Sequence, residues 1–332
     1  MRRVFVIAEV GSTHDGSFGN ACRLIEVAAD CGADAVKFQT HIAEAETTPD
    51  APNPPYFQGE SRYDYFRRTA FDKEQWIALR ELAHEKGIRM ISSPFSNEAV
   101  QLLAEIGVDG LKIPSGEVTN LPMLELAAHT GKTIYLSSGM SSWQELDQAV
   151  ETIRRHTDKL SLMQCTSAYP CPYERVGLNV MDEMRQRYGL PVGLSDHTLT
   201  NYAALAAVAL GASRLEKHLT LSKLMYGSDA AHSAEPDQFA DLVRGIRAVT
   251  RMLESPVDKD DLSDLERMKE VFEKSVVALV DIRKGQRLTR ENIGLRKPGT
   301  GLPGGRLAEC LNKTASKDLR AGQVLTEDQV RW

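Results

Sequence analysis

The chain repeats one unit eight times, a short apolar run typical of a strand followed by an amphipathic stretch typical of a helix. The strand-like runs cover residues 4–10, 35–40, 89–95, 110–115, 133–139, 160–167, 192–197 and 214–220. Eight such alternations over about 250 residues predict a closed (β/α)8 barrel, the TIM barrel. An open doubly wound sheet is the competing fold, but no glycine-rich nucleotide loop follows the first run.

Polar side chains stand at the carboxyl end of nearly every predicted strand, which is where the active sites of such barrels lie. A helix N-cap explains a serine at one such position, but it does not explain the whole ring. Because a barrel needs only apolar filling to fold, the ring predicts a functional site. Its members are Glu9, Lys37, Gln39, Ser92, Ser93, Lys112, Ser115, Ser137, Thr166, Ser167, Ser195, Asp196, His197, Lys217 and His218.

Two members of the ring are histidines on consecutive strands. His197 closes one run and His218 lies near the end of the next, with the apolar stretch 201–213 between them. A crossover of that length makes the strands parallel neighbours, so both imidazoles lie on one rim. Neutral imidazole is the commonest protein ligand of divalent transition metals, and Asp196 and Glu216 stand nearby in sequence. We expect a metal site here; the alternative is a pair of hydrogen-bonded core histidines.

Lys37 and Lys112, among the serines of the ring, predict a cationic bowl for a small ligand that carries phosphate and carboxylate groups. One alternative is that each lysine forms an ion pair, with Glu9 or Glu117. Another is a Schiff-base lysine, as in class I aldolases, which share the fold. With a metal-binding pair of histidines in the same ring, polarisation of a carbonyl by the cation is the more economical mechanism.

Charge and composition exclude several classes of partner. A net charge of −6 and a pI near 5.8 argue against nucleic acid or an anionic membrane as the main partner. No signal peptide opens the chain and no run is long enough to span a bilayer, so we expect a cytoplasmic protein. The cysteines have no metal-type spacing and are expected to be reduced thiols: Cys22, Cys31, Cys165, Cys171 and Cys310.

Three segments interrupt or follow the barrel pattern. Residues 44–70 form a proline- and aromatic-containing insertion, expected to cover the site. The predicted barrel spans residues 1–254, and a charged linker arm of residues 255–274 follows it. Residues 275–332 form a small β-rich domain, because the segments 281–293 and 318–330 repeat each other with turns at Gly285 and Gly322. This domain is either a structural appendage or a cap over a barrel mouth.

The chain resembles the N-acetylneuraminate (sialic acid) synthase family, including the pseudaminate and legionaminate synthases, over essentially its whole length. The motifs that carry the resemblance are IAEVGSTHDGS, DAVKFQTH, SSPFS, LKIPSGE, LSSGM, CTSAYPCPYE, GLSDHT and LEKHLT. The small domain resembles the antifreeze-like SAF domain, a β-clip fold, that follows the barrel in these enzymes. The resemblance therefore implies a TIM barrel followed by a SAF domain.

The resemblance also implies a reaction. Phosphoenolpyruvate condenses with an open-chain N-acetylmannosamine-like aldose to give a nine-carbon 2-keto-3-deoxy sugar acid and phosphate, with C–O cleavage. By this resemblance His197 and His218 hold a divalent metal, Mn²⁺ first and Mg²⁺ or Co²⁺ as alternatives, and Glu9 is the base. The implied phosphoenolpyruvate residues are Lys37, Ser93, Lys112, Ser115, Ser137, Ser167 and Ser195. The implied sugar residues are Gln39, Tyr169, Asp229 and Lys297. A homodimer with domain-swapped SAF caps is implied as well.

Three residues depart from the family pattern. Thr13 stands where the family has Asn before a histidine, and Ser167 replaces an Asn of the sixth-strand motif. Lys297 replaces the Arg of an RPG motif that reaches the partner's sugar, with Arg296 before it. The sugar thus stays open among N-acetylmannosamine, its 6-phosphate and a 2,4-diamino-6-deoxy relative. A non-enzymatic carbohydrate-binding protein is the remaining alternative, suggested by the small domain alone.

Overall fold

The computed structural model describes residues 3–54 and 59–332. The chain divides into two compact units, the first ending at Ser255 and the second beginning at Pro256. Each unit has its own apolar core. Within the described residues, no helix is both long enough and apolar enough to cross a membrane.

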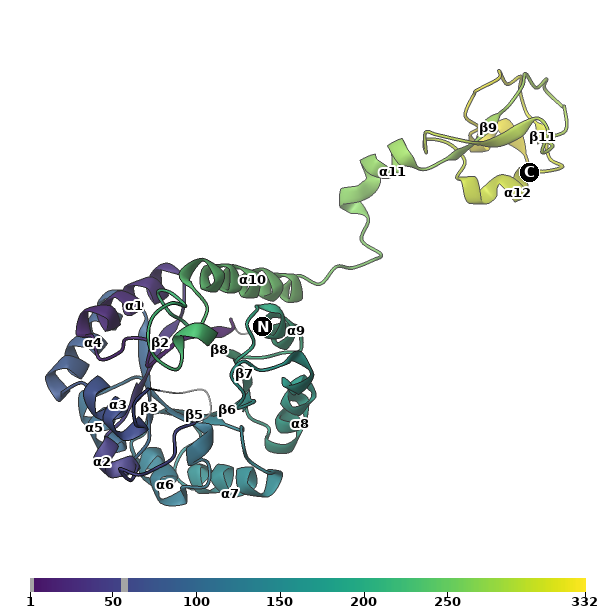
Figure 1. Cartoon of the computed structure of the whole chain (residues 1–332). Coiled ribbons are helices and arrows are strands. Elements are labelled where there is room, and N and C mark those ends of the chain that lie inside the picture. The colour runs from purple at the N-terminus through teal and green to yellow at the C-terminus, as the bar shows by residue number, and fades with distance from the viewer. Residues whose placement is uncertain (1–2, 55–58) are drawn as a thin grey trace. The chain divides into compact units, whose positions relative to one another are not determined.

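The first unit is a closed barrel of eight parallel strands in the order β1 to β8, with helices around it (Figure 1). This confirms the predicted TIM barrel. The strands are β1 Phe5–Gly11, β2 Ala35–Thr40, β3 Arg89–Pro94, β4 Gly110–Ile113, β5 Thr133–Ser137, β6 Leu160–Cys165, β7 Val192–Asp196 and β8 Arg214–His218. The outer helices are α1 Phe18–Asp30, α4 Lys73–Glu85, α5 Asn97–Ile106, α6 Leu121–His129, α7 Trp143–Arg154, α8 Leu178–Tyr188, α9 Tyr202–Ala209 and α10 Pro236–Glu254.

Most predicted strands extend past the observed carboxyl ends, by up to two residues. The run 110–115 shows one reason, because Pro114 has no N–H to donate to a neighbouring strand, and Ser115 starts a short 3-10 helix. Helix starts follow their capping residues: Asp72 caps α4 and Ser142 caps α7, each in a capping box. The last residues of several runs, such as Ser115 and His197, therefore lie just past the strands, in the loops at the barrel rim.

Alternation along the strands divides side chains between the helix-facing layer and the barrel interior. The helix-facing layer is apolar, as in Val6, Ala8 and Val36. The interior is apolar only in one layer, where a separate cluster packs. That cluster consists of Ile7, Ala35, Ile91, Tyr135 and Met163. Two residues further along β1 and β2 the interior positions are Glu9 and Lys37, so the interior becomes charged toward the carboxyl rim.

The insertion after β2 forms two helices, α2 Ala43–Glu46 and α3 Arg62–Thr69. Ser61 caps α3 by accepting a hydrogen bond from the Asp64 backbone N–H. The side chain of Tyr65 is buried, so α3 packs onto the barrel unit.

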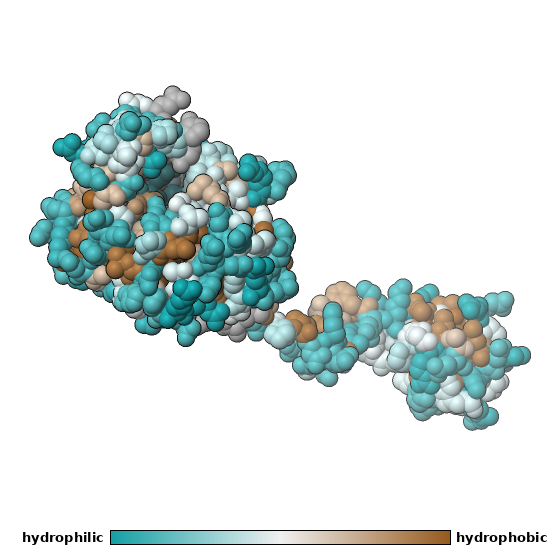
Figure 2. All heavy atoms as spheres, turned by 90° about the horizontal axis from the view of Figure 1, so that it is seen from below, coloured by the Kyte–Doolittle hydropathy of each residue, from teal (hydrophilic) through white to brown (hydrophobic). Residues whose placement is uncertain are grey.

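The second unit is a small β-rich domain preceded by a helix. Its elements are α11 Glu266–Phe272, β9 Ser275–Ala278, β10 Ile293–Arg296, α12 Leu307–Cys310, β11 Thr314–Ala315 and β12 Val330–Arg331. Within the predicted linker arm, α11 packs onto this domain, because the Gly299 N–H donates to the Glu270 carbonyl at 2.7 Å. Apolar side chains of the second unit also reach its surface (Figure 2). Those of the arm include Leu262, Leu265, Met268, Val271 and Phe272.

The internal repeat folds as two copies that pair with each other. Ile282 of the first copy and Leu319 of the second exchange backbone hydrogen bonds of 2.9 and 2.8 Å. Asp318 accepts from the Lys284 N–H at 2.7 Å, and Asp281 accepts in return from the Ala321 N–H at 2.8 Å. Both predicted turns are found, since Gly285 and Gly322 each have a φ of +81°.

Candidate active site

Four charged side chains form a buried row across the barrel interior. Lys37 Nζ lies 2.7 Å from Glu9 Oε2. Lys112 Nζ lies 2.7 Å from Glu216 Oε2, and a contact of 3.6 Å links Lys37 Nζ to Glu216 Oε1. The side chains are at most 7% exposed, so each charge depends on its partners rather than on water.

Two members of the row, Glu216 and Lys37, stay ionised at neutral pH. Burial alone raises the pKa of Glu216, but the charges of Lys112 and Lys37 outweigh it and lower this pKa to about 2. Burial lowers the pKa of Lys37, but the charges of Glu216 and Glu9 outweigh it and raise this pKa above its usual value. A Schiff-base lysine must present a neutral amine. The arrangement therefore argues against that role for Lys37.

Lys37 forms the expected ion pair with Glu9, whereas Lys112 does not pair with Glu117. Glu117 lies in the loop after β4 and accepts a hydrogen bond from Asn120 Nδ2 at 2.9 Å, while burial raises its pKa. The partner of Lys112 is Glu216, which lies 104 positions later in the chain, on β8. Closure of the barrel brings the two strands together across the interior.

The predicted phosphoenolpyruvate serines lie around this row. Lys37 donates to Ser93 Oγ at 3.2 Å, and Lys112 donates to Ser195 Oγ at 2.8 Å. Ser137 ends β5 and is buried. The structure thus joins four of these predicted residues in two direct contacts.

Ser115 and Ser167 line a small space beside Gly139. A Cβ atom added to Gly139 would clash with Ser115 Oγ and would lie 2.7 Å from Ser167 Oγ. Because glycine has no side chain, the space between the two hydroxyls stays open. Hydroxyls around a glycine backbone form a cradle suited to phosphate oxygens.

The two histidines lie together, with ring centroids 5.6 Å apart. His197 Nδ1–H donates to the Thr166 carbonyl at 2.9 Å, which leaves Nε2 free to bind a ligand. Burial, followed by the neighbouring His218, lowers the pKa of His197 to about 3, so its imidazole is neutral. The buried Nδ1 of His218 has no hydrogen-bond partner among the described residues. These features fit two nitrogen ligands of a divalent metal.

Asp196 and Glu216, the acidic residues near the histidines in sequence, form ion pairs with lysines. Asp196 is paired with Lys217 at 2.7 Å, and Lys217 also donates to the Thr198 and Thr200 carbonyls. Glu216 belongs to the charged row. Within the described residues, no group of three or more His, Cys, Asp and Glu side chains is arranged to hold a metal. The pair of histidines is therefore the protein's candidate contribution, and the metal stays a prediction.

A cavity of about 430 Å³ is lined by predicted residues from both substrate sets, including Gln39, Ser115, Ser167, Tyr169 and Asp229, and by His218. Burial alone raises the pKa of Asp229, but His218 and hydrogen bonds from Ser12 lower it below its usual value. Asp229 Oδ2 accepts from the Ser12 N–H at 2.9 Å and from its Oγ at 2.8 Å. Gln39, Tyr169 and Asp229 therefore line the same cavity, and their contact with a sugar stays a prediction.

Sequence reasoning missed several residues of this cavity. The insertion was expected to cover the site, and α3 does contribute Arg62, Tyr65 and Phe66 to the wall. The aromatic content of segment 44–70 was the available signal. The other unpredicted lining residues are Ser12, His41, Pro54, Phe95, Pro114, Gly116, Met140 and Ser228.

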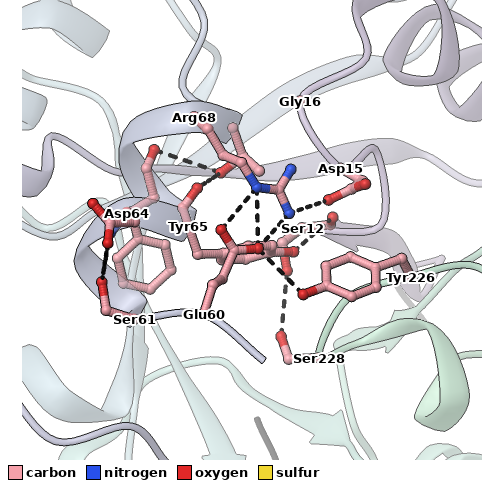
Figure 3. Close-up of polar contacts among 12 residues, drawn as sticks. Ser12, Asp15, Gly16, Glu60, Ser61, Asp64, Tyr65, Arg68, Tyr226 and Ser228 are labelled. Carbon is pink, nitrogen blue, oxygen red and sulfur yellow. Dashed lines mark hydrogen bonds and ion pairs between the residues drawn. The ribbon is translucent and has the colours of Figure 1, made fainter. Parts of the chain in front are cut away.

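Arg68 on α3 is the centre of a hydrogen-bond network that connects the loops after β1, β2 and β8 (Figure 3). Its guanidinium donates to both carboxylate oxygens of Glu60 and to Asp15 Oδ1 at 2.9 Å. Tyr226, in the loop after β8, donates to the same Glu60 at 3.2 Å. The loops after β1, β2 and β8 are therefore joined around one guanidinium, which we call the Arg68 latch.

Comparison with known proteins identifies the family. Residues 24–258 match the NeuB family. The chain belongs to the NeuB family. Residues 273–331 match the SAF domain, which confirms the second part of the predicted fold.

The chain is 36% identical to the N,N'-diacetyllegionaminic acid synthase of Campylobacter jejuni, over 98% of this chain and 100% of the relative. It is 37% identical to the N-acetylneuraminate-9-phosphate synthase of Homo sapiens, over 88% of this chain and 82% of that protein. The N-acetylneuraminic acid (sialic acid) synthetase structure from Leptospira borgpetersenii, solved with citrate, superposes with a TM-score of 0.72 at 31% identity, covering 81% of this chain and 91% of that one. This NeuB-family chain is an enzyme, a transferase of the sialic acid synthase class.

The structure shows the contacts of two residues that depart from the NeuB-family pattern, Thr13 and Lys297. Thr13 is buried and its hydroxyl donates to the Val10 and Leu219 carbonyls at 2.8 and 3.1 Å, so it ties together the ends of β1 and β8. Lys297 lies in the second unit, with Nζ 4.8 Å from the ring centroid of Phe272 on α11. The contact of Lys297 with a sugar stays a prediction.

Proposed function

We propose that this enzyme condenses phosphoenolpyruvate with an open-chain N-acetylmannosamine-type aldose to give a nine-carbon 2-keto-3-deoxy sugar acid. The carbon–carbon bond forms between C3 of phosphoenolpyruvate and the aldehyde carbon. Water adds at C2, the C2–O bond breaks, and inorganic phosphate leaves. The observation that carries the proposal is the buried row of two lysines and two carboxylates, which contacts through Gln39 a cavity lined by some residues of each predicted substrate set.

Lys37 and Lys112 suit phosphoenolpyruvate because each ammonium is fixed by a carboxylate and directed toward a serine. The Ser115–Gly139–Ser167 cradle supports phosphate binding on the same rim. Ser137 completes the proposed set. Burial of these groups removes water, which strengthens every charge-assisted contact with the ligand.

The charge balance of the site supports a metal. The row itself is neutral, since two carboxylates offset two ammonium groups, and phosphoenolpyruvate brings several negative charges. His197 and His218 are the residues that would hold the divalent ion, Mn²⁺ by preference. When bound, it would supply a Lewis acid that polarises the aldehyde oxygen.

Glu9 is the proposed base. Its carboxylate contacts Lys37 through Oε2 and Gln39 through Oε1, so its orientation is fixed from two sides. An oriented carboxylate in a buried site can accept the proton of the water that adds at C2. Gln39, Tyr169 and Asp229 would contact the sugar from the adjoining cavity.

The proposed assembly is a homodimer in which the SAF domain of one chain caps the barrel of the other. Apolar side chains exposed on α11 support an interface for this arm. In the dimer, Lys297 would approach the sugar bound by the partner subunit.

The test is phosphate release from phosphoenolpyruvate with a panel of aldoses: N-acetylmannosamine, its 6-phosphate and a 2,4-diacetamido-6-deoxy aldose. Run in ¹⁸O-labelled water, the reaction should place label at C2 of the product and none in phosphate. Label in phosphate, or phosphate release without an aldose, would contradict the route. Trapping of a substrate adduct on a lysine by borohydride would support the aldolase alternative instead.

A further inference from the structure

A chain of hydrogen bonds leads from the insertion helices to the proposed base. Glu46 at the end of α2 contacts His41 Nδ1 through both carboxylate oxygens, at 2.9 and 3.0 Å. His41 Nε2 lies 3.2 Å from Gln39 Oε1. Gln39 Nε2 donates to Glu9 Oε1 at 2.8 Å. Neither His41 nor Glu46 takes part directly in the proposed reaction.

His41 is held rigidly in this chain. Phe66 of α3 stacks on one ring face at 3.7 Å with an interplanar angle of 4°. Phe95, in the loop after β3, stacks on the ring at 4.1 Å and 21°. The side chains of His41 and Glu46 are only 9% and 3% exposed. The imidazole therefore has little freedom to rotate away from Gln39.

The acceptors along the chain determine where its protons lie. Glu9, ion-paired with Lys37, can only accept, so the Gln39 amide must direct its NH₂ group toward Glu9. Its carbonyl oxygen then faces His41, and two acceptors cannot share a hydrogen bond. The ring nitrogen that faces Gln39 must carry a proton. The contact with Glu46 satisfies the other ring nitrogen, whichever partner holds the proton between them.

We propose that His41 is a positioning residue that fixes the amide of Gln39, and through it Glu9, by presenting Nε2–H to the Gln39 carbonyl. The proposal rests on the proposed function, in which Glu9 is the base and Gln39 contacts the sugar. A reversed amide would place its oxygen against the Glu9 carboxylate and turn that group away from Lys37. Seating of α2 and α3 is thereby linked to the orientation of the base.

Two substitutions separate this role from simple support of the insertion. Glutamine places an amide NH₂ near the position of Nε2, whereas asparagine places one near Nδ1. If His41 acts on Gln39, His41→Gln should retain kcat within about fivefold of wild type and His41→Asn should lower kcat at least twentyfold. Support of Glu46 and the insertion alone predicts the reverse order.

The decisive readout does not depend on catalysis. In ¹⁵N-histidine-labelled full-length protein, the His41 signal, assigned by its loss in His41→Asn, should be that of a ring protonated at Nε2. A ring protonated only at Nδ1 would overturn the proposal even if the enzyme condenses every aldose. Failure of the wild-type enzyme to release phosphate with any aldose would instead refute the proposed function and leave the measured protonation of His41 standing. Equal kcat values for His41→Gln and His41→Asn would also overturn the positioning role.

Discussion

At the scale of single residues, the two lysines of the charged row should differ from a third buried lysine, Lys217, in their effect on phosphoenolpyruvate binding. We expect Lys37→Ala and Lys112→Ala to raise the KM for phosphoenolpyruvate by roughly 10- to 150-fold, since each loses a charge-assisted contact of about 1.5–3 kcal/mol. Lys217→Ala removes an equally buried lysine whose partners are Asp196 and two carbonyls. It should lower the melting temperature without changing that KM. Initial-rate kinetics and thermal unfolding of the three variants check this, and an unchanged KM in both rim variants would contradict it.

The contribution of Glu216 to the stability of the protein should depend on pH. Its pKa falls from 4.5 to about 2 on folding, so its contribution to stability is fully present above about pH 4.5 and is lost as pH falls toward 2. Glu216→Gln should destabilise the protein at pH 7, and the difference from wild type should shrink between pH 4.5 and 2. Urea unfolding at a series of pH values measures this. A difference that stays constant across that window would show that Glu216 titrates normally.

The histidine pair predicts a metal requirement. His197→Ala and His218→Ala should each abolish turnover and lower the content of bound Mn²⁺, while the melting temperature stays close to that of the wild-type apoprotein, because both side chains lie at the rim. Metal analysis after dialysis and kinetics with and without EDTA provide the check. Full activity of EDTA-treated protein without added metal would rule out the assignment.

At the scale of elements, the Arg68 latch connects α3 to two other rim loops. Arg68→Ala should raise the KM for the aldose more than that for phosphoenolpyruvate, because Tyr65 and Phe66 of α3 line the cavity whereas the lysines lie on the strands. Arg67→Ala is the control, since the Arg67 side chain is 68% exposed and its ion pair with Glu44 is 4.0 Å long. Equal effects of the two substitutions on both KM values would show that the latch does not position α3.

The sequence predicts elements well and partners across the barrel poorly. The strand–helix alternation and the strand-end ring follow from periodicity, which is local information. Alternation along β7 also separates Ser195, which faces Lys112, from Asp196, which pairs with Lys217. The pairing of Lys112 with Glu216 depends on barrel closure, which no local pattern encodes. The contacts of α3 could not be predicted from the sequence either, because they depend on where an irregular insertion folds back onto the barrel.

At the scale of the whole molecule, the proposed swap of SAF domains makes each active site the product of two chains. Mixing Glu9→Gln chains with Lys297→Glu chains should restore up to about a quarter of wild-type activity after subunit exchange, since one site of each mixed dimer keeps both native residues. Each parent alone should be inactive or nearly so. Demonstrated exchange without recovered activity would mean that Lys297 acts on its own barrel or has no part in the reaction.

The paired repeat makes the two halves of the second unit depend on each other. Each copy supplies the aspartate that accepts a turn N–H of the other, through Asp318 with Lys284 and Asp281 with Ala321. Because the contacts are reciprocal, substitution of either aspartate removes a hydrogen-bond acceptor from a turn in the opposite copy. The two copies therefore hold each other's turns in place, and neither half of the domain has its full set of contacts alone.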